Sequence, residues 1–198
     1  GAEYALENLI KMDEEGKKLP VFPLRGSLHM SSRSTHELIS SPNVVAVLPG
    51  AAPLLNDEFM VYSAHLDHIG ELAGTGHNDV INNRTVDDAS GISVMLETAR
   101  LLTEHEAPRR STLFIAVTAE EKGLVGSEYF AINPTVPTSS MVAVVNLDMP
   151  VLLYDFGDVI AFGAEHSTLQ DAVQTAADEA GIGLTPDPFP EQNIFVRS

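Results

Sequence analysis

An uninterrupted apolar run at residues 111–118 (STLFIAVT) constrains the fold of this chain more than any other feature. A strand with one solvated face alternates apolar and polar residues, whereas a strand covered on both faces is apolar nearly throughout. Apolar runs at 43–49, 59–64 and 141–147 predict three more strands, the last of them also buried. The run at 111–118 therefore indicates the central strand of a sheet packed between two layers.

Amphipathic segments alternate with these runs. Helices are predicted over 3–16, 90–105, 124–131 and 167–181, with further strands at 20–30 and 158–163. Gly16 and Gly181 are expected to end their helices, and Ser167 is a candidate N-cap. The buried face of the helix at 90–105 is expected to hold Ile92, Met95, Leu96, Ala99 and Leu102. This alternation predicts an α/β fold, a three-layer sandwich whose mixed, mostly parallel sheet has helices on both faces.

Composition narrows the classes of function. The formal net charge of -17 over 198 residues would repel phosphates, which argues against nucleic acid or an anionic membrane as a partner. Much of this acid is expected to form a solvated surface. No apolar run approaches the length of a membrane span. The chain has no cysteine, so a metal site here must use histidine, aspartate and glutamate.

One histidine and several carboxylates follow the predicted strands or precede a helix. They are His65 and Asp67, Asp87 and Asp88, Glu120 and Glu121, and Asp148. If the sheet is mainly parallel, the carboxyl ends of its strands share one edge, where ligand sites lie in folds of this class. Crowded carboxylates raise one another's pKa, and a bound pair of cations would relieve that repulsion.

Each of these motifs has a simpler interpretation when taken alone. His65-x-Asp67 could face solvent, Glu120-Glu121 could be a solvated turn, and Asp148 could be a turn residue. Asp87-Asp88 could be acids at a helix N-terminus. Together they favour a two-metal site in which His65 binds a metal through one nitrogen and Asp67 accepts the other N–H. Asp87 could bridge two ions, and one of the two glutamates could bind metal while its neighbour acts as general base.

Four stretches carry a resemblance to a known family: SAHLDHIG (63–70), VDDASG (86–91), VTAEEKGLVGSEYF (117–130) and VNLDMP (145–150). In order and spacing they resemble the co-catalytic di-zinc exopeptidases, which include aminopeptidase Y, bacterial leucyl aminopeptidase, glutamate carboxypeptidase and glutaminyl cyclase. The resemblance begins at about residue 43 and continues to the end of the chain.

The resemblance implies a role for each matching residue. His65 and Asp148 would bind one metal, Glu121 the second, and Asp87 both. Asp67 would orient His65, Glu120 would be the general base, and the Asp87–Asp88 peptide bond would be cis. The ions would be two divalent metals, Zn²⁺ above Co²⁺ or Mn²⁺ for these nitrogen and oxygen donors.

The sequence departs from the family pattern in two places. The segment NNRTVDD (82–88) is longer than the stretch that relatives have before the bridging aspartate. The family's last ligand is a histidine near the C-terminus, often directly after Arg-Ser-Asp, whereas this sequence ends at FVRS (195–198). The chain is therefore expected to be truncated just before its fifth ligand, and impaired as a fragment. His68 and His166 are the nearby alternatives, although neither matches the motif.

The implied activity is an aminopeptidase that acts on peptides with a free N-terminus. The alternatives are a related exopeptidase or a glutaminyl cyclase, and an inactive interaction module. A cyclase pocket would be expected to contain tryptophan, and the chain has none. A single domain over 1–198 is expected, in which 1–40 supply an edge helix and strand that could follow an inserted domain outside the chain. Family analogy implies a periplasmic or secreted location, although no signal peptide opens the sequence, and the oligomeric state is left open.

Overall fold

The computed structural model describes residues 4–23, 26–27, 29–71, 81–82, 85–151 and 153–194. The chain divides into two compact units, Gly1–Ile39 and Ser40–Ser198. The expectation of a single domain over 1–198 stays a prediction.

The first unit contains one helix, α1, over Leu6–Glu14. The predicted glycine stop is present, because Gly16 has a φ of 64°, in the left-handed region that glycine adopts without strain. The ring of Tyr4 stacks on that of Phe22 at a centroid distance of 4.1 Å. The strand expected at 20–30 is absent from the described residues of that range. Pro20 and Pro23 lie on either side of Val21, and proline has no N–H to donate to a strand ladder.

The second unit contains a four-stranded sheet in the order β1-β3-β2-β4. The strands are β1 (Val44–Leu48), β2 (Phe59–His65), β3 (Ser111–Val117) and β4 (Met141–Asn146). β2 is parallel to both β3 and β4, and only β1 runs antiparallel to its neighbour. The predicted mixed, mostly parallel α/β sheet is therefore confirmed.

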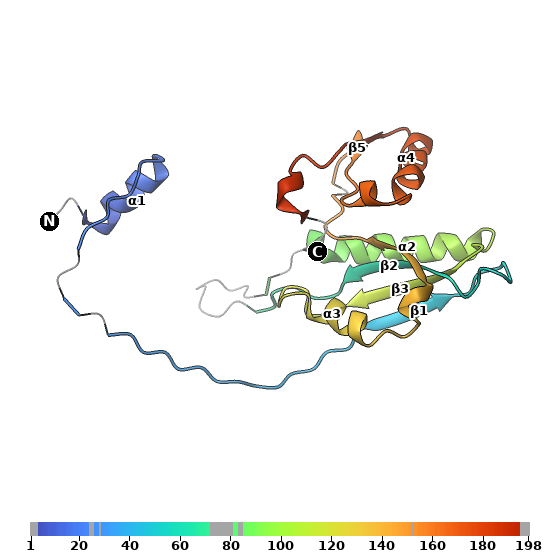
Figure 1. Ribbon diagram of the computed structural model, residues 1–198, viewed down its shortest axis with the longest axis horizontal. Coiled ribbons are helices and arrows are strands. Elements are labelled where there is room, and N and C mark those ends of the chain that lie inside the picture. The colour runs from blue at the N-terminus through green and yellow to red at the C-terminus, as the bar shows by residue number, and fades with distance from the viewer. Residues whose placement is uncertain are drawn as a thin grey trace. The chain divides into compact units, whose positions relative to one another are not determined.

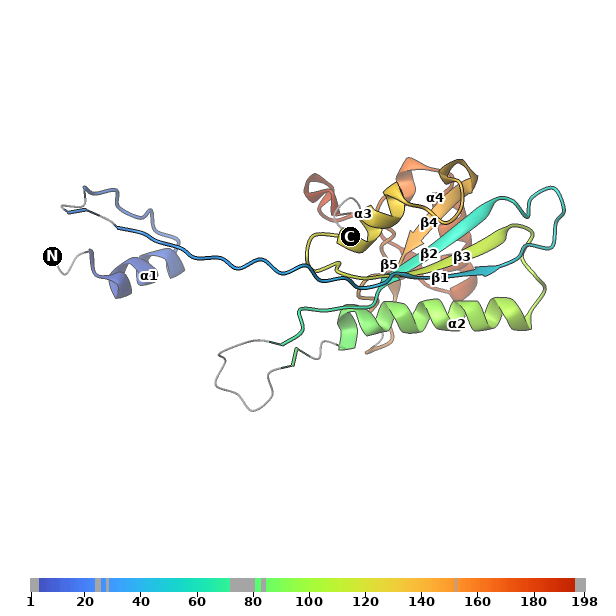
Figure 2. The same ribbon diagram turned by 90° about the horizontal axis from the view of Figure 1, so that it is seen from below.

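Helices cover both faces of this sheet (Figures 1 and 2). α2 (Ser90–Glu104) lies along one face, and α3 (Val125–Ile132) lies on the other. Every residue of β3 is buried, as its apolar run predicted. Alternate β3 side chains fill two cores: Leu113, Ile115 and Val117 on one face, and Phe114 and Ala116 with Met95 of α2 on the other.

Two burial predictions are wrong. β4 alternates half-buried and exposed residues, so one of its two faces is largely uncovered, and among the described strands it pairs only with β2. Leu96 of α2 is 62% exposed. Ile92, Met95, Ala99 and Leu102 form the stripe that packs on the sheet, and Leu96 lies beside that stripe in solvent.

The chain after β4 forms a smaller layer. β5 (Asp158–Val159) and β6 (Gly183–Leu184) make a short parallel pair, so the strand predicted at 158–163 is reduced to two residues. α4 (Leu169–Ala180) ends at Gly181, which has a φ of 71°, as predicted. Thr168 is the N-cap residue, while the Ser167 hydroxyl accepts a hydrogen bond from the Leu169 N–H. Shorter helical turns lie at Thr85–Ala89, Thr138–Ser140, Ala164–His166 and Pro190–Gln192.

The long polar segment predicted at 68–86 is described only in part. Glu71 and Ile81 form an isolated antiparallel bridge. Residues 72–80 and 83–84, and with them part of the NNRTVDD segment, lie outside the described residues, as do 195–198. Within the part of the chain that the structure describes, no helix combines the length and apolar character needed to cross a membrane.

Candidate metal centre

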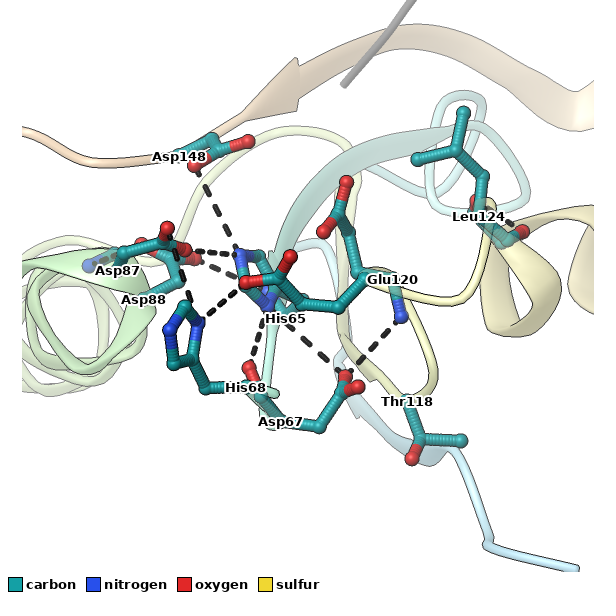
Figure 3. A network of polar contacts seen from close by, with 12 residues as sticks. His65, Asp67, His68, Asp87, Asp88, Thr118, Glu120, Leu124 and Asp148 are labelled. Atoms are coloured by element: carbon teal, nitrogen blue, oxygen red, sulfur yellow. Dashed lines mark hydrogen bonds and ion pairs between the residues drawn. The ribbon is translucent and has the colours of Figure 1, made fainter. Parts of the chain in front are cut away.

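The predicted site residues meet where the parallel strands end (Figure 3). His65 is the last residue of β2, and a Leu66 N–H to Val117 carbonyl bond of 2.8 Å continues the ladder beyond it. Glu120 and Glu121 lie in the turn between β3 and α3. Gly126 lets α3 approach that turn closely, because a Cβ at this position would lie 2.1 Å from the Thr118 carbonyl oxygen.

His65 is the centre of a first group of possible metal ligands. Its Nε2 lies 3.1 Å from Asp87 Oδ1 and 3.9 Å from Asp148 Oδ1. The side chain is 3% exposed, and Nε2 has no hydrogen-bond partner among the described residues. The ring Nδ1 donates to the Asp67 carbonyl oxygen at 2.8 Å, and a carbonyl can only accept. Whenever the ring is neutral, its lone pair is therefore on Nε2, the nitrogen that faces the two carboxylates.

Asp67 holds its neighbours in a different way from that expected. The Nδ1–H of the His65 ring is accepted by the backbone carbonyl of Asp67 and not by its carboxylate, because the carboxylate Oδ1 lies 4.0 Å from Nδ1. That Oδ1 accepts the backbone N–H of Glu120 at 3.2 Å instead. Asp67 thus fixes the tautomer of His65 through its main chain and positions the Glu120 turn through its side chain.

A second group comprises His68, Asp87 and Glu121. His68 Nδ1 lies 3.8 Å from Asp87 Oδ2 and in close contact with Glu121 Oε1. Asp87 therefore belongs to both groups and turns one oxygen toward each histidine. The peptide bond between Asp87 and Asp88 is cis, as the resemblance implied. Sequence reasoning named His68 only as an alternative ligand, and its place beside Asp87 could not be derived from spacing.

Asp88 was given no separate role by the sequence, yet it connects three elements of the site. Its buried carboxylate accepts N–H groups from His65 at 3.1 Å, Gly91 at 3.0 Å and Met149 at 3.1 Å. These donors lie at the end of β2, at the start of α2 and after β4. Asp88 is therefore an internal acceptor that holds the three ligand-bearing segments together.

A family model for peptidase family M28 matches residues 43–198. The chain belongs to peptidase family M28. It is 41% identical over 64 residues to a probable zinc metalloprotease of Pyrenophora tritici-repentis, covering 32% of this chain and 14% of that protein. It is 32% identical over 118 residues to aminopeptidase Y of Saccharomyces cerevisiae, covering 60% of this chain and 19% of that protein.

A solved structure shares the fold as well. BSAP, a zinc aminopeptidase from Bacillus subtilis, superposes with a TM-score of 0.53 at 26% identity, covering 75% of this chain and 37% of that one. This M28 chain thus spans 14% to 19% of the length of the two curated relatives and 37% of the solved structure.

The electrostatics of this M28 site are those of crowded, partly buried acids. Burial raises the pKa of Asp148, and the Asp87 and Glu121 charges raise it further. Burial likewise raises the pKa of Glu120, reinforced by the charges of the three neighbouring acids. Burial alone would lower the pKa of His65, but the surrounding carboxylates and the hydrogen bond to Asp67 raise it overall. The metal-free site therefore favours the binding of protons, and the same negative potential would attract a divalent cation.

An open groove with a volume of about 1030 Å³ runs from this site along β4 and the smaller layer. His65, Glu120 and Asp148 lie at its polar end. Most of the remaining lining is apolar and includes Tyr154, Phe156, Ile160, Phe162, Leu169 and Val173, although Asp155 and Asp158 also line the groove. The groove thus places a substrate-sized apolar surface next to the cluster of possible metal ligands.

Proposed function

We propose that the protein carrying this chain is a metal-dependent aminopeptidase with two divalent ions, zinc in preference to others. The proposal rests on the carboxylate of Asp87, because its two oxygens face different groups of possible metal ligands. Ligands of one tetrahedral zinc lie about 3.3 Å apart, from metal–ligand distances of about 2.0–2.1 Å. The 3.1 Å separation of His65 Nε2 and Asp87 Oδ1 is close to that spacing, and the 3.8 and 3.9 Å separations are longer.

The donors also suit the metal chemically. Nitrogen and carboxylate oxygen ligands without thiolate are typical of catalytic zinc sites. His65 Nε2 is buried and faces two carboxylates, an arrangement that is stable only with a proton or a metal cation between them. His65, Asp87 and Asp148 would hold one ion, and Asp87 with Glu121 would hold the other. Such ions polarise a peptide carbonyl and make a water more acidic.

Glu120 is the general base in this proposal. Its backbone is held by the Asp67 carboxylate, and its side chain borders the groove beside His65 and Asp148. We assign it the removal of a proton from the attacking water and the transfer of that proton to the departing amine. The adjacent Glu121 contacts His68 and is a candidate ligand, so the two neighbouring glutamates take different roles.

The charges of the groove favour a substrate with a free amino terminus. None of the described residues that line the groove is lysine or arginine. A carboxypeptidase needs a cation to bind the terminal carboxylate, which the acids here would instead repel. An α-ammonium group is attracted by the same acids, so the geometry supports an aminopeptidase better than a carboxypeptidase.

The test is turnover of aminoacyl p-nitroanilides by the natural full-length protein and its Glu120→Gln variant. Loss of a general base is expected to lower kcat by about 10²–10⁴-fold while zinc content stays unchanged. Glu128→Gln, at an exposed position on α3, is the matched control and should retain full activity. Retention of activity by Glu120→Gln would refute the assignment of the base. Absence of turnover in the zinc-loaded natural protein would refute the aminopeptidase itself.

A further inference from the structure

We propose that Asn43 is a positioning residue for the general base, because its side-chain amide holds the turn that carries Glu120. The proposal rests on the proposed function, in which Glu120 removes the proton from the attacking water. Asn43 lies directly before β1, 75 residues before Thr118 in the chain. It is not among the described residues that line the groove, so its effect on the reaction passes through the turn and not through contact with substrate.

The Asn43 amide connects the two ends of the turn between β3 and α3. Its Oδ1 accepts the backbone N–H of Thr118, directly after the last residue of β3, at 3.0 Å. Its Nδ2 donates to the carbonyl oxygen of Gly126, in the first turn of α3, at 2.8 Å. The reverse orientation of the amide would place donor against donor and oxygen against oxygen, so only this orientation fits. Glu120 therefore lies between two points that one planar group holds together.

The surroundings of the amide leave no other group in its place. The backbone ladder between β1 and β3 ends at the pair of Val44 and Ala116, so the Thr118 N–H lies beyond it. The Asn43 side chain supplies the acceptor that the ladder does not. A Cβ at Gly126 would lie 2.7 Å from Asn43 Oδ1 and 2.7 Å from the Thr118 nitrogen. The absence of a side chain at Gly126 thus makes room for the amide between the end of the strand and the start of the helix.

The turn needs such support because two of its residues have unfavourable backbone conformations. Ala119 has a φ of 56° and Leu124 a φ of 61°, in the left-handed region that residues with a side chain seldom adopt. Such conformations persist only where the surrounding structure enforces them. Inside the turn, the Leu124 N–H donates to the Glu120 carbonyl oxygen at 2.8 Å, and Figure 3 shows Glu120 held from outside by Asp67. The Asn43 amide adds the link between the two ends, so the direction of the Glu120 side chain depends on it.

The first experiment compares Asn43→Ala with the wild type in the natural full-length protein, by turnover of an aminoacyl p-nitroanilide at saturating Zn²⁺. A shift of about 1 Å in a catalytic group can cost about 100-fold in rate, so kcat should fall by about 10–100-fold while KM changes little. Asn133→Ala is the matched control, because the Asn133 side chain also donates to a backbone carbonyl, that of Tyr129, but at the opposite end of α3. Its kcat should equal that of the wild type. An unchanged kcat in Asn43→Ala, with or without a raised KM, would overturn the proposal.

A second measurement separates the positioning of the base from a general loss of structure. In the Glu120→Gln background the base is absent, so adding Asn43→Ala should lower the remaining kcat by less than about 2-fold. The same 10–100-fold loss in that background as in the wild type would show that Asn43 acts on the fold or on the metals, and would refute its role toward the base.

Asn43→Asp keeps the proposal testable if the alanine variant does not fold, because aspartate has nearly the size of asparagine. It retains the acceptor for the Thr118 N–H and loses the donor to the Gly126 carbonyl, so its kcat should lie between those of the wild type and Asn43→Ala. Wild-type kcat in Asn43→Asp would count against the amide link. Full activity in Glu120→Gln would refute the proposed base and this inference together, whereas loss of activity in Glu120→Gln with full activity in Asn43→Ala would refute this inference alone.

Discussion

Replacing Asp88 with alanine should destabilise the metal-free protein, because it removes one carboxylate that accepts three backbone N–H groups. His65 and Gly91 are buried, so their N–H groups would lose their acceptor without gaining water. Met149 is 46% exposed, and its N–H can turn to solvent. The perturbation therefore leaves two buried donors without a partner.

The expected loss follows from two opposing effects. Each buried donor left without an acceptor costs about 1–3 kcal/mol, so two cost about 2–6 kcal/mol. The substitution also removes a buried charge, and burial raises the pKa of Asp88, which shows that ionisation there is unfavourable. That relief offsets part of the cost, and we expect a net loss of about 3 kcal/mol in the free energy of unfolding.

The assay is urea denaturation of the chelator-treated protein, followed by circular dichroism. Asp88→Asn is the second variant to measure. Its amide oxygen can still accept the backbone N–H groups of Gly91 and Met149, while its NH₂ group would face the backbone N–H of His65. It should lose roughly half as much stability as Asp88→Ala. Asp57→Ala, at an exposed turn, should change stability by less than about 0.5 kcal/mol. A loss below about 1 kcal/mol for Asp88→Ala would refute the reasoning.

Two further predictions concern the same region. Gly91→Ala would place a Cβ 2.3 Å from the Leu147 carbonyl oxygen, so we expect a loss of about 1–3 kcal/mol, seen as a lower Tm in calorimetry. In the metal-free protein the raised pKa values of Asp148, Glu120 and His65 mean that the folded state binds more protons than the unfolded chain. Stability should therefore fall as pH rises, starting near the unfolded carboxyl pKa of about 4 and continuing past about 6.5 for the histidine. Urea midpoints that rise over this range would contradict the pH prediction.

The sheet could be predicted from sequence because local and tertiary preferences agree in its strands. Within the run at 111–118, residues 113–117 (LFIAV) are all apolar, so a position covered on both faces suits them, and β3 is such a strand. The segment at 20–30 (PVFPLRGSLHM) also contains apolar residues, but two prolines and a glycine interrupt it, and its described residues form no strand. Apolar residues therefore predict a strand only where no proline interrupts the hydrogen-bonded ladder.

The site was predictable at the strand ends and much less so in the turns. His65 and Asp148 could be placed because each lies at the carboxyl end of a parallel strand, and these ends share one edge of the sheet. His68 could not be placed, because its side-chain direction depends on how the turn after His65 folds. Asp88 was overlooked because an acid before a helix usually caps that helix, and nothing in its spacing indicates three acceptor contacts to separate segments.

The charge balance explains why such a cluster can be stable at all. Asp87, Glu121 and Asp148 carry three negative charges among the donors, and Glu120 adds a fourth beside them. Two divalent cations would balance these four negative charges. Burial is the main reason why the pKa of Glu120 is raised, and bound cations would cancel the smaller contribution of the neighbouring acids. The acidity of the site therefore has two consequences: it destabilises the metal-free protein as pH rises, and it favours the binding of divalent cations.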